Sequence, residues 1–272
     1  MKRDGGPPLA VLAAFGAAGT PRALPGGHGE SWRVGDVVLK PSYGIEESLW
    51  RADALATLGA RDFRLARPVR SLDGRWVVDG WEASEAIDGR EDPGRVDQVV
   101  RVGIAFHRAI ADRPRPHFLD ERDNPWVHGD RVAWDERPVV GCPATLELLV
   151  PLSDARRPVV SRSQLVHGDL LGNVLFSPGL LPAVIDWAPY WRPPAWALAV
   201  AVVDALCWHG APADAIDRWS SQPEWGQMLV RALMFRIATR EAAFGPDGPD
   251  HEPNDAYRPV VELAIRAATR AE

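Results

Sequence analysis

The chain has 272 residues, of which 46% are hydrophobic and 25% are charged, a composition typical of globular proteins. This length suits either one large domain or two lobes, since a domain commonly holds roughly 100–200 residues. The formal net charge of −6 disfavours general nucleic-acid binding, because the phosphate backbone selects for a basic excess.

Signals for a membrane or for secretion are weak. The longest apolar run, residues 195–208, is shorter than the roughly 18 residues that a membrane span needs, and it contains an aspartate. The N-terminus resembles a poor signal peptide, but an early aspartate and the prolines at residues 7–8 suit the start of a packed helix instead. The two cysteines, Cys142 and Cys207, lie in apolar stretches and fit a reducing compartment. We therefore expect a cytoplasmic protein with neither a membrane nor a nucleic-acid partner.

Residues 24–88 predict short strands and turns around one helix. The dipeptide Gly35-Asp36 separates two runs rich in strand-forming residues and is a strong hairpin signal. Apolar residues at helical spacing predict a helix over residues 46–58. Two further strands are expected to be joined at Asp73-Gly74. This order of elements predicts a small α/β sheet.

From residue 95 onwards the pattern becomes helical. Apolar residues repeat every three or four positions over residues 96–110 and predict an amphipathic helix, with His107 in the core. Residues 114–162 are rich in proline and charge, and we place only one short helix there, over residues 143–149. A hairpin is expected after Asn173, and about three apolar helices beyond residue 196.

The chain is therefore expected to be an α+β protein with two lobes. Residues 1–87 would form a small N-terminal β-sheet lobe with one helix, and residues 88–272 a larger, mainly helical C-terminal lobe. A ligand cleft is expected where the two lobes join, near residues 84–88.

The tetrapeptide VHGD occurs twice, at residues 127–130 and 166–169. After the second copy, Asp169 and Asn173 share one short loop, and the hairpin that follows delivers Asp186. Phosphoryl transfer from a nucleotide needs one carboxylate to orient the acceptor hydroxyl, and a second carboxylate with an amide oxygen to hold Mg²⁺. The second copy therefore carries the more specific chemical signal.

These motifs resemble those of the aminoglycoside phosphotransferase-like kinases, which include choline and homoserine kinases. In that family H-G-D is followed by Asn, and the metal loop has the form I-D-[FW], matched here by residues 185–187. The resemblance implies a protein-kinase-like fold, ATP and Mg²⁺ as cofactors, and a small-molecule acceptor of unknown identity. It implies catalytic roles for Asp169 and His167, and magnesium-binding roles for Asn173 and Asp186. The strings HGDLLGNVLF and VIDWAPYWRPPAWA are similar, more narrowly, to an actinobacterial branch of the family.

The resemblance also places nucleotide contacts in the small lobe. The stretch GGHGES lacks a full G-x-G-x-x-G motif, but it precedes a hairpin that ends in Lys40, so its backbone N–H groups can approach phosphates. Gly27, Gly29 and Ser31 are the candidates there. Lys40 stands where such kinases keep a phosphate-binding lysine, the alternative being a surface lysine at the end of a strand.

Two further contacts complete the expected nucleotide site. A carboxylate on the helix should position Lys40; Glu46, Glu47 and Asp53 are candidates and Glu47 is favoured, although Arg51 occupies one place where the acid is expected. The segment that joins the lobes should run past the adenine, and Glu85 and Ile87 represent it.

The first VHGD copy has no asparagine at a usable distance and leads into a charged turn. We interpret it as a surface or acceptor-side loop, the alternative being that His128 and Asp130 belong to the acceptor pocket.

Two departures from the family pattern bear on activity. The loop between Asp169 and Asn173 is one residue shorter than is common, which removes up to about 3.5 Å of chain reach. Gly172 permits unusual backbone angles that would re-aim Asn173. In place of a family acid beyond the metal loop the chain has WRPPAW, and Arg192 in this string indicates a different acceptor or none. The aromatic residues of this region line a pocket or belong to the core, and we expect at least half to be core: Trp187, Tyr190, Trp191 and Trp196.

Three functions remain open on the sequence. The leading one is an ATP- and Mg²⁺-dependent phosphotransferase acting on a small molecule. The second is a kinase-like nucleotide-binding protein with weak or no transfer activity, for which the shortened loop argues. The third is a metal-dependent hydrolase that uses both HGD strings, since His and Asp are ordinary metal ligands. The sequence carries no signal for an oligomeric state.

Overall fold

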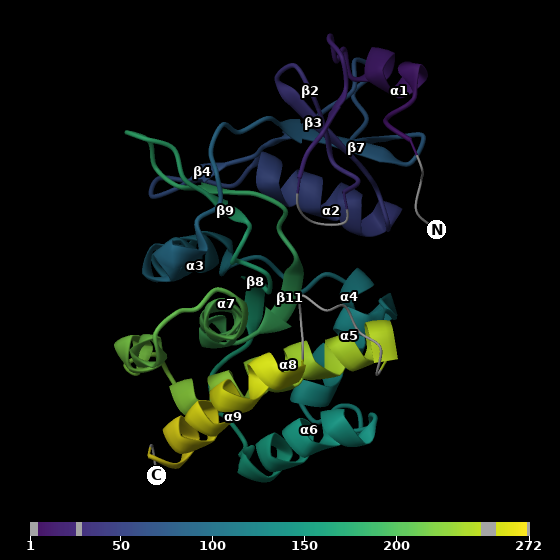
Figure 1. Cartoon of the computed structure of the whole chain (residues 1–272). Helices are drawn as coiled ribbons and strands as arrows, with labels where there is room; N and C mark the ends of the chain where they lie inside the picture. The colour runs from purple at the N-terminus through teal and green to yellow at the C-terminus, as the bar shows by residue number, and fades with distance from the viewer. Residues whose placement is uncertain (1–4, 26–28, 246–253, 271–272) are drawn as a thin grey trace. The chain divides into compact units, whose positions relative to one another are not determined.

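The computed structural model describes residues 5–25, 29–245 and 254–270. The chain forms two compact units, each discontinuous in sequence: Met1–Arg90 with Leu175–Asp186, and Glu91–Val174 with Trp187–Glu272. A sheet dominates the first unit and helices the second, as the labels of Figure 1 show. A single division after residue 87 does not describe these units, because the segment that ends at Asp186 packs with the first one.

The first unit is built on an antiparallel sheet with the strand order β1-β2-β3-β7-β5, and β6 also pairs with β7. The expected hairpin is present: β2 and β3 pair around Gly35, whose φ of +60° suits glycine. The strands are β1 (Arg22–Ala23), β2 (Trp32–Val34), β3 (Val37–Pro41), β5 (Pro68–Val69), β6 (Val77–Val78) and β7 (Trp81–Glu85).

The turn at Asp73-Gly74 does not join two directly paired strands, contrary to the sequence prediction. Both β5 and β6 lie antiparallel to β7, with Val69 opposite Ala83 and Val77 opposite Glu82. Strands β5 and β6 therefore pair with successive parts of β7, and the residues between them, which include Asp73-Gly74, form a loop. The tight turn lies instead between β6 and β7, where Asp79 and Gly80 both have positive φ.

Two helices belong to the first unit. Helix α1 (Leu9–Ala14) buries Val11 and Leu12 in a core that includes Leu39 and Trp81 of the sheet. Helix α2 (Ile45–Ala56), within two residues of the predicted bounds, contacts β5 and β6. A smaller sheet has the order β4-β10-β9, in which β10 lies parallel to β4. Its strands are β4 (Arg64–Leu65), β9 (Val174–Leu175) and β10 (Ala183–Val184).

The second unit is mainly helical, with one two-stranded ribbon of β8 (Gln164–His167) and β11 (Pro189–Arg192). The α-helices are α3 (Val96–Ile110), α4 (Phe118–Glu121), α5 (Pro125–Ala133), α6 (Pro143–Ala155), α7 (Pro194–Trp208), α8 (Trp225–Phe244) and α9 (Asn254–Thr269). Short 3-10 helices are η1 (Pro93–Arg95), η2 (Ala213–Ala215) and η3 (Asp217–Trp219).

Helix α8 is the centre of this unit, since it contacts α5, α6, α7 and α9. Its backbone comes close to two neighbours at glycines. A Cβ on Gly226 would lie 2.5 Å from the Cα of Ala268 in α9, and one on Gly129 of α5 would lie 2.5 Å from the carbonyl oxygen of Phe235. Only glycine permits this packing distance.

Residues 114–162 contain more helix than the sequence analysis placed there. Helix α5 was missed, although its start carries two standard signals: the Asn124 side chain accepts the Val127 N–H at 3.0 Å, and Pro125 occupies the first turn. Helix α6 continues past residue 149 and includes Pro151.

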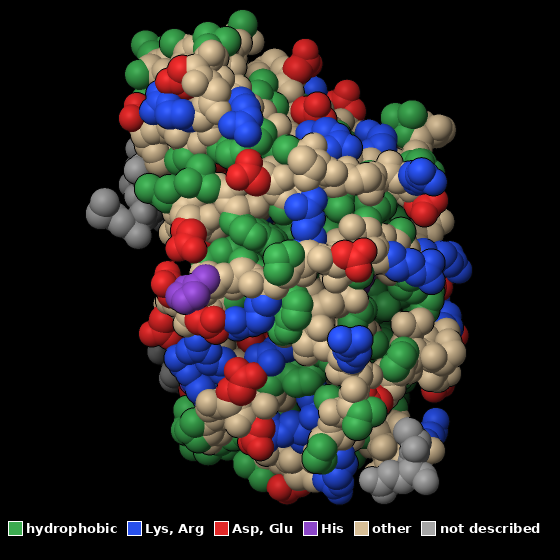
Figure 2. All heavy atoms as spheres, turned by 180° about the vertical axis from the view of Figure 1, so that it is seen from behind, with side chains coloured by type: hydrophobic (Ala, Val, Ile, Leu, Met, Phe, Trp, Pro, Cys, Tyr) green, Lys and Arg blue, Asp and Glu red, His purple; other side chains and the backbone are tan. Residues whose placement is uncertain are grey.

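No helix of the described part of the chain is both long enough and apolar enough to span a bilayer. On the face seen in Figure 2, acidic and basic side chains are interspersed.

Candidate functional site

The second VHGD copy forms the end of β8 and the loop that follows it. Pro189 of β11 lies opposite His167, and the backbone N–H of His167 donates to Nε2 of His107 at 3.1 Å. The Nδ1 atom of His167 accepts the backbone N–H of Asp169 at 3.2 Å. His167 is fully buried. This buried histidine therefore contacts the loop from inside through the backbone of Asp169.

His107 belongs to the core, as predicted from the sequence. Burial, and secondarily the neighbouring His167, lowers the pKa of His107 to about 3. The ring is therefore neutral at ordinary pH, which allows Nε2 to accept a hydrogen bond.

Gly172 compensates for the shortened loop. Its φ is +86°, a conformation that glycine adopts readily, and it turns Asn173 back toward Asp169. The Nδ2 atom of Asn173 donates to the backbone oxygen of Asp169 at 2.7 Å and to its carboxylate at 3.0 Å. The amide oxygen is thus the Asn173 atom left for a cation.

Arg236 of α8 contacts this loop, and its role was not predicted from the sequence. Its Nη2 donates to Oδ1 of Asp169 at 2.7 Å and to Oδ2 of Asp204 at 2.5 Å, and its Nε donates to Asp204 at 2.8 Å. Burial alone would lower the pKa of Arg236, but Asp204 and then Asp169 raise it well above its ordinary value. The available signal was Asp204, the one charged residue of the otherwise apolar helix α7.

The Asp169 carboxylate is therefore held at both oxygens, by Arg236 on one and by Asn173 on the other. Charge-assisted hydrogen bonds of this kind fix a side chain in one orientation. A carboxylate so fixed is suited to orienting an acceptor hydroxyl, which is the task that phosphoryl transfer assigns to it.

Lys40 and Asp186 form an ion pair within the first unit, although they lie far apart in the sequence. Lys40 lies on β3, directly opposite Glu82 on the paired strand β7. The Nζ atom of Lys40 is 3.4 Å from the Glu82 carboxylate. Asp186 follows β10 and has a φ of +49°. The sequence-predicted phosphate-binding lysine and metal-binding aspartate are thus neighbours.

Besides Asp186, the acid Glu82 of β7 contacts Lys40. Glu47 lies 3.4 Å from Arg51, one turn along α2, and Arg51 in turn pairs with Glu82 at 2.5 Å. Burial alone would raise the pKa of Glu82, but the charges of Arg51 and Lys40 lower it. Arg51, at the helix position where an acid was expected, thus pairs with the strand residue Glu82. Asp53, another candidate, accepts from the indole of Trp76 at 2.6 Å.

The glycine-rich stretch connects β1 to β2. Gly27 lies outside the described residues. Gly29 is exposed with a φ of +70°, and the backbone oxygen of Ser31 accepts from Leu24 at 2.9 Å.

The segment expected to reach the adenine begins at the end of β7. Glu85, the last residue of β7, is exposed, and its backbone N–H donates to Arg67 at 2.8 Å. Ile87 is half-buried and follows the strand. The N–H of Glu85 is therefore already used within the sheet.

The first VHGD copy is part of α5 and is not a loop, contrary to the preferred sequence interpretation. Asp130 is buried, and its two oxygens accept from Arg192 at 2.9 and 2.7 Å. Burial raises the pKa of Asp130, partly offset by Arg192. The same four letters are helical here because Asn124 caps the helix and Gly129 fits against α8.

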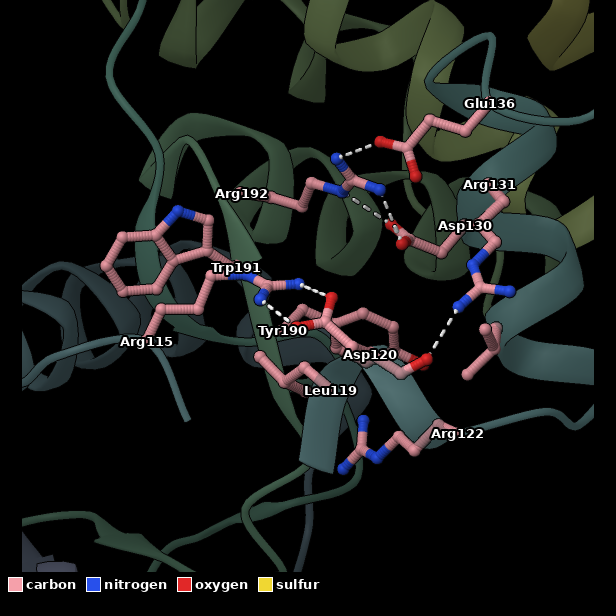
Figure 3. Close-up of a pocket in the computed structure, with 11 residues that line it drawn as sticks. Arg115, Leu119, Asp120, Arg122, Asp130, Arg131, Glu136, Tyr190, Trp191 and Arg192 are labelled. Carbon is pink, nitrogen blue, oxygen red and sulfur yellow. Dashed lines mark hydrogen bonds and ion pairs between the residues drawn. The ribbon is translucent and has the colours of Figure 1, made fainter. Parts of the chain in front are cut away.

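A pocket of about 320 Å³ lies in the second unit beside this copy. It is shown in Figure 3 and is lined by Arg115, Leu119, Asp120, Arg122, Val127, Asp130, Arg131, Glu136, Tyr190, Trp191 and Arg192. Asp130 thus lines a pocket, whereas His128 contacts Arg137 at 3.2 Å and does not line it. That this pocket binds the acceptor stays a prediction.

The aromatic residues after the metal loop divide between core and pocket. Trp187, Tyr190 and Trp196 are buried, and Trp191 is half-buried in the pocket wall. Tyr190 belongs to the core and also lines the pocket, and its ring packs against the loop that carries Asp169. A Cβ on Gly168 would lie 2.4 Å from that ring.

The hydrolase hypothesis finds no support in this arrangement. Both oxygens of Asp130 already bind Arg192, and within the described residues no three His, Cys, Asp or Glu side chains are grouped to hold a metal ion. An ion held by one carboxylate, one amide oxygen and nucleotide phosphates needs no such group.

The donor atoms present fit a magnesium nucleotide. Asp186 offers a carboxylate that is 45% exposed, and Lys40 beside it offers a cation for phosphate. Hard cations such as Mg²⁺ prefer oxygen ligands and keep phosphate oxygens in their shell. This fold and these donor atoms suit a phosphotransferase.

Comparison with protein families gives the family. The chain matches the phosphotransferase enzyme family over residues 45–230 and belongs to it. A search among curated proteins found no significant match.

Solved structures share the fold at low sequence identity. An aminoglycoside phosphotransferase from Alicyclobacillus acidocaldarius is 18% identical, with a TM-score of 0.60 over 99% of this chain and 96% of that one. A choline/ethanolamine kinase family protein from Mesorhizobium loti is 15% identical, with a TM-score of 0.56 over 94% of each chain. The amicoumacin kinase hAmiN, in complex with AMP-PNP, Ca²⁺ and its ligand Ami, is 13% identical, with a TM-score of 0.58 over 92% and 88%. The chain has a protein-kinase-like α+β fold, as the sequence predicted.

Proposed function

We propose that the protein is an ATP- and Mg²⁺-dependent kinase that transfers the γ-phosphate to a hydroxyl of a small molecule in the cytoplasm. The observation that carries this proposal is the ion pair of Lys40 with Asp186. Two residues from separate motifs, one suited to phosphate and one to a metal ion, meet in the same unit. A magnesium nucleotide would supply a partner for each residue. Its phosphates would attract the lysine, and its magnesium ion would attract the carboxylate.

Each residue has a task in this reaction. Lys40 would bind phosphate and Glu82 would keep the lysine in place, while Asp186 would offer its carboxylate to a magnesium ion. The amide oxygen of Asn173 is the second ligand that the family resemblance implies. When bound, such an ion would supply positive charge to offset the charge that develops on the phosphoryl group. Asp169, fixed by Arg236, orients the acceptor hydroxyl for in-line attack.

The structural relatives agree with the cofactor but differ in the acceptor. The amicoumacin kinase structure contains a non-hydrolysable nucleotide and a divalent cation, and other relatives are described as aminoglycoside phosphotransferases or choline/ethanolamine kinases. These relatives therefore support the proposed nucleotide, but they do not indicate one acceptor for this chain.

The test combines nucleotide binding with turnover. Wild type, Asp186→Ala, Asp169→Ala and the exposed control Asp112→Ala are compared for the rise in melting temperature with MgATP and for slow ADP release. Loss of the MgATP shift in Asp186→Ala alone, with loss of ADP release in both active-site variants, is the expected result. An unchanged shift in Asp186→Ala contradicts the proposal.

A second candidate function is nucleotide binding without transfer. The shortened loop favours it, since Asn173 donates to the Asp169 carboxylate that should face the acceptor. A MgATP shift without ADP release, in water and with every hydroxyl compound supplied, would establish this alternative.

A further inference from the structure

The pocket beside α5 has a charge pattern that points to the acceptor. Four arginines and three carboxylates line it, together with an apolar wall that includes Leu119, Val127 and Trp191. Figure 3 shows the charged side chains of α4, α5, β11 and the residues next to α4 and α5 close to one another. An excess of arginines over acids is the opposite of what a polycationic acceptor requires.

The three carboxylates are already neutralised by arginines. Asp120 receives two hydrogen bonds from Arg115, both at 2.7 Å, and Asp130 receives two from Arg192. Arg192 also donates to Glu136 at 2.7 Å. Hydrogen bonds from Arg115 lower the pKa of Asp120. No acidic side chain of the pocket is therefore without a cationic partner.

Arg131 differs from Arg115 and Arg192. Its guanidinium donates to the backbone oxygen of Asp120 at 3.3 Å, and no carboxylate of the described residues lies within ion-pair distance of it. An arginine presents five N–H donors in a planar fork that matches a carboxylate or a phosphate. Most of the donors of Arg131 are thus available to an incoming oxyanion.

The pocket adjoins the Asp169 loop through Tyr190. Tyr190 lines the pocket, and its ring packs against Gly168, the residue that precedes Asp169. Burial and then Asp130 raise the pKa of Tyr190 above its usual range, and Asp169 acts in the same direction. Tyr190 is therefore a wall that the pocket shares with the loop that carries Asp169, so a ligand in the pocket would lie next to that loop.

We propose that this pocket binds an acceptor that carries a compact oxyanion, held by Arg131, next to an apolar or aromatic body that packs on Trp191. The inference rests on the proposed kinase function, because it assigns the acceptor class of the same enzyme. Arg192 already neutralises Asp130 and Glu136, so the pocket should select an anionic hydroxy compound and reject a cationic one.

Binding of matched ligand series tests the pocket without nucleotide. The first series is para-hydroxyphenylacetate, its amide and tyramine, and the second is γ-hydroxybutyrate, its amide and the corresponding amino alcohol. Each series keeps one body and one hydroxyl and changes only the charge. Isothermal titration at low salt should show the carboxylate binding about fivefold to tenfold more tightly than the amide in at least one series, with the amine weakest.

Two variants of opposite effect and one control make the test specific. Arg131→Gln should abolish the preference for the carboxylate. Asp120→Asn should increase it severalfold, because Arg115 loses its carboxylate partner. Arg108→Gln removes the same charge from an exposed position of α3 outside the pocket and should change nothing.

Four outcomes would overturn the proposal: equal binding across both series, no binding in either, tighter binding of the amines, or a carboxylate preference that survives Arg131→Gln. The MgATP shift and ADP release are measured separately on the same preparations. A retained nucleotide response with failed ligand selectivity would reject the pocket and keep the kinase.

Discussion

Replacing Arg236 with methionine should destabilise the second unit more than any surface change. Asp204 is only 4% exposed, and the guanidinium of Arg236 gives it two hydrogen bonds, at 2.8 and 2.5 Å. Removing one partner of a buried ion pair costs about 3–5 kcal/mol, because the remaining charge loses its counter-ion. This is a large part of the roughly 5–15 kcal/mol that stabilises a typical domain.

Urea unfolding at pH 7, followed by circular dichroism, measures the effect. The double variant Arg236→Met with Asp204→Leu should recover most of the loss, since no buried charge then remains unpaired. Arg108→Met, at an exposed position of α3, should change the free energy of unfolding by less than about 0.5 kcal/mol. A loss below about 1 kcal/mol in the single variant, or a double variant no more stable than the single one, would refute this reasoning.

Three further predictions concern the loop and its supports. His107 has a pKa of about 3 when folded, below its unfolded value near 6.5, so its contribution to stability is complete above pH 6.5 and is lost as the pH falls toward 3. The free energy of unfolding should fall by about 2 kcal/mol between pH 6.5 and pH 5, at about 1.4 kcal/mol per pH unit, and His107→Gln should remove this slope. Gly129→Ala should cost at least about 1–3 kcal/mol in urea unfolding because its Cβ would lie 2.1 Å from Thr239 Oγ1, whereas Gly59→Ala, where an added Cβ meets no atom within 4 Å, should cost less than about 1 kcal/mol; equal losses would contradict the packing argument. Gly172→Ala strains a φ of +86° and should lower ADP release at least about tenfold while leaving the MgATP melting shift in place, so full activity in this variant would show that the loop does not depend on that angle.

Local patterns predicted the elements and motifs well. The hairpin at Gly35, the helix over residues 96–110 and the positive φ of Gly172 all follow from properties of a few neighbouring residues, and the structure confirms them. These features depend on backbone sterics and on periodic burial, which a sequence displays directly.

Features set by tertiary packing were not predicted. Arg236 reaches Asp169 only because α8 passes the loop, and Glu82 meets Lys40 only because β3 and β7 share that register. The two VHGD copies show the same limit. Identical letters become a helix at residue 127 and a strand end at residue 166, because the neighbouring cap and the packed glycine decide between them.

The discontinuous first unit has a consequence for protein engineering. A truncated chain that ends near residue 90 would lack β10, the parallel partner of β4, and would also lack Asp186, the counter-ion of Lys40. Exchanging this unit between related kinases therefore requires two grafted segments, and a chimaera with a single crossover would combine a lysine from one parent with an aspartate from the other.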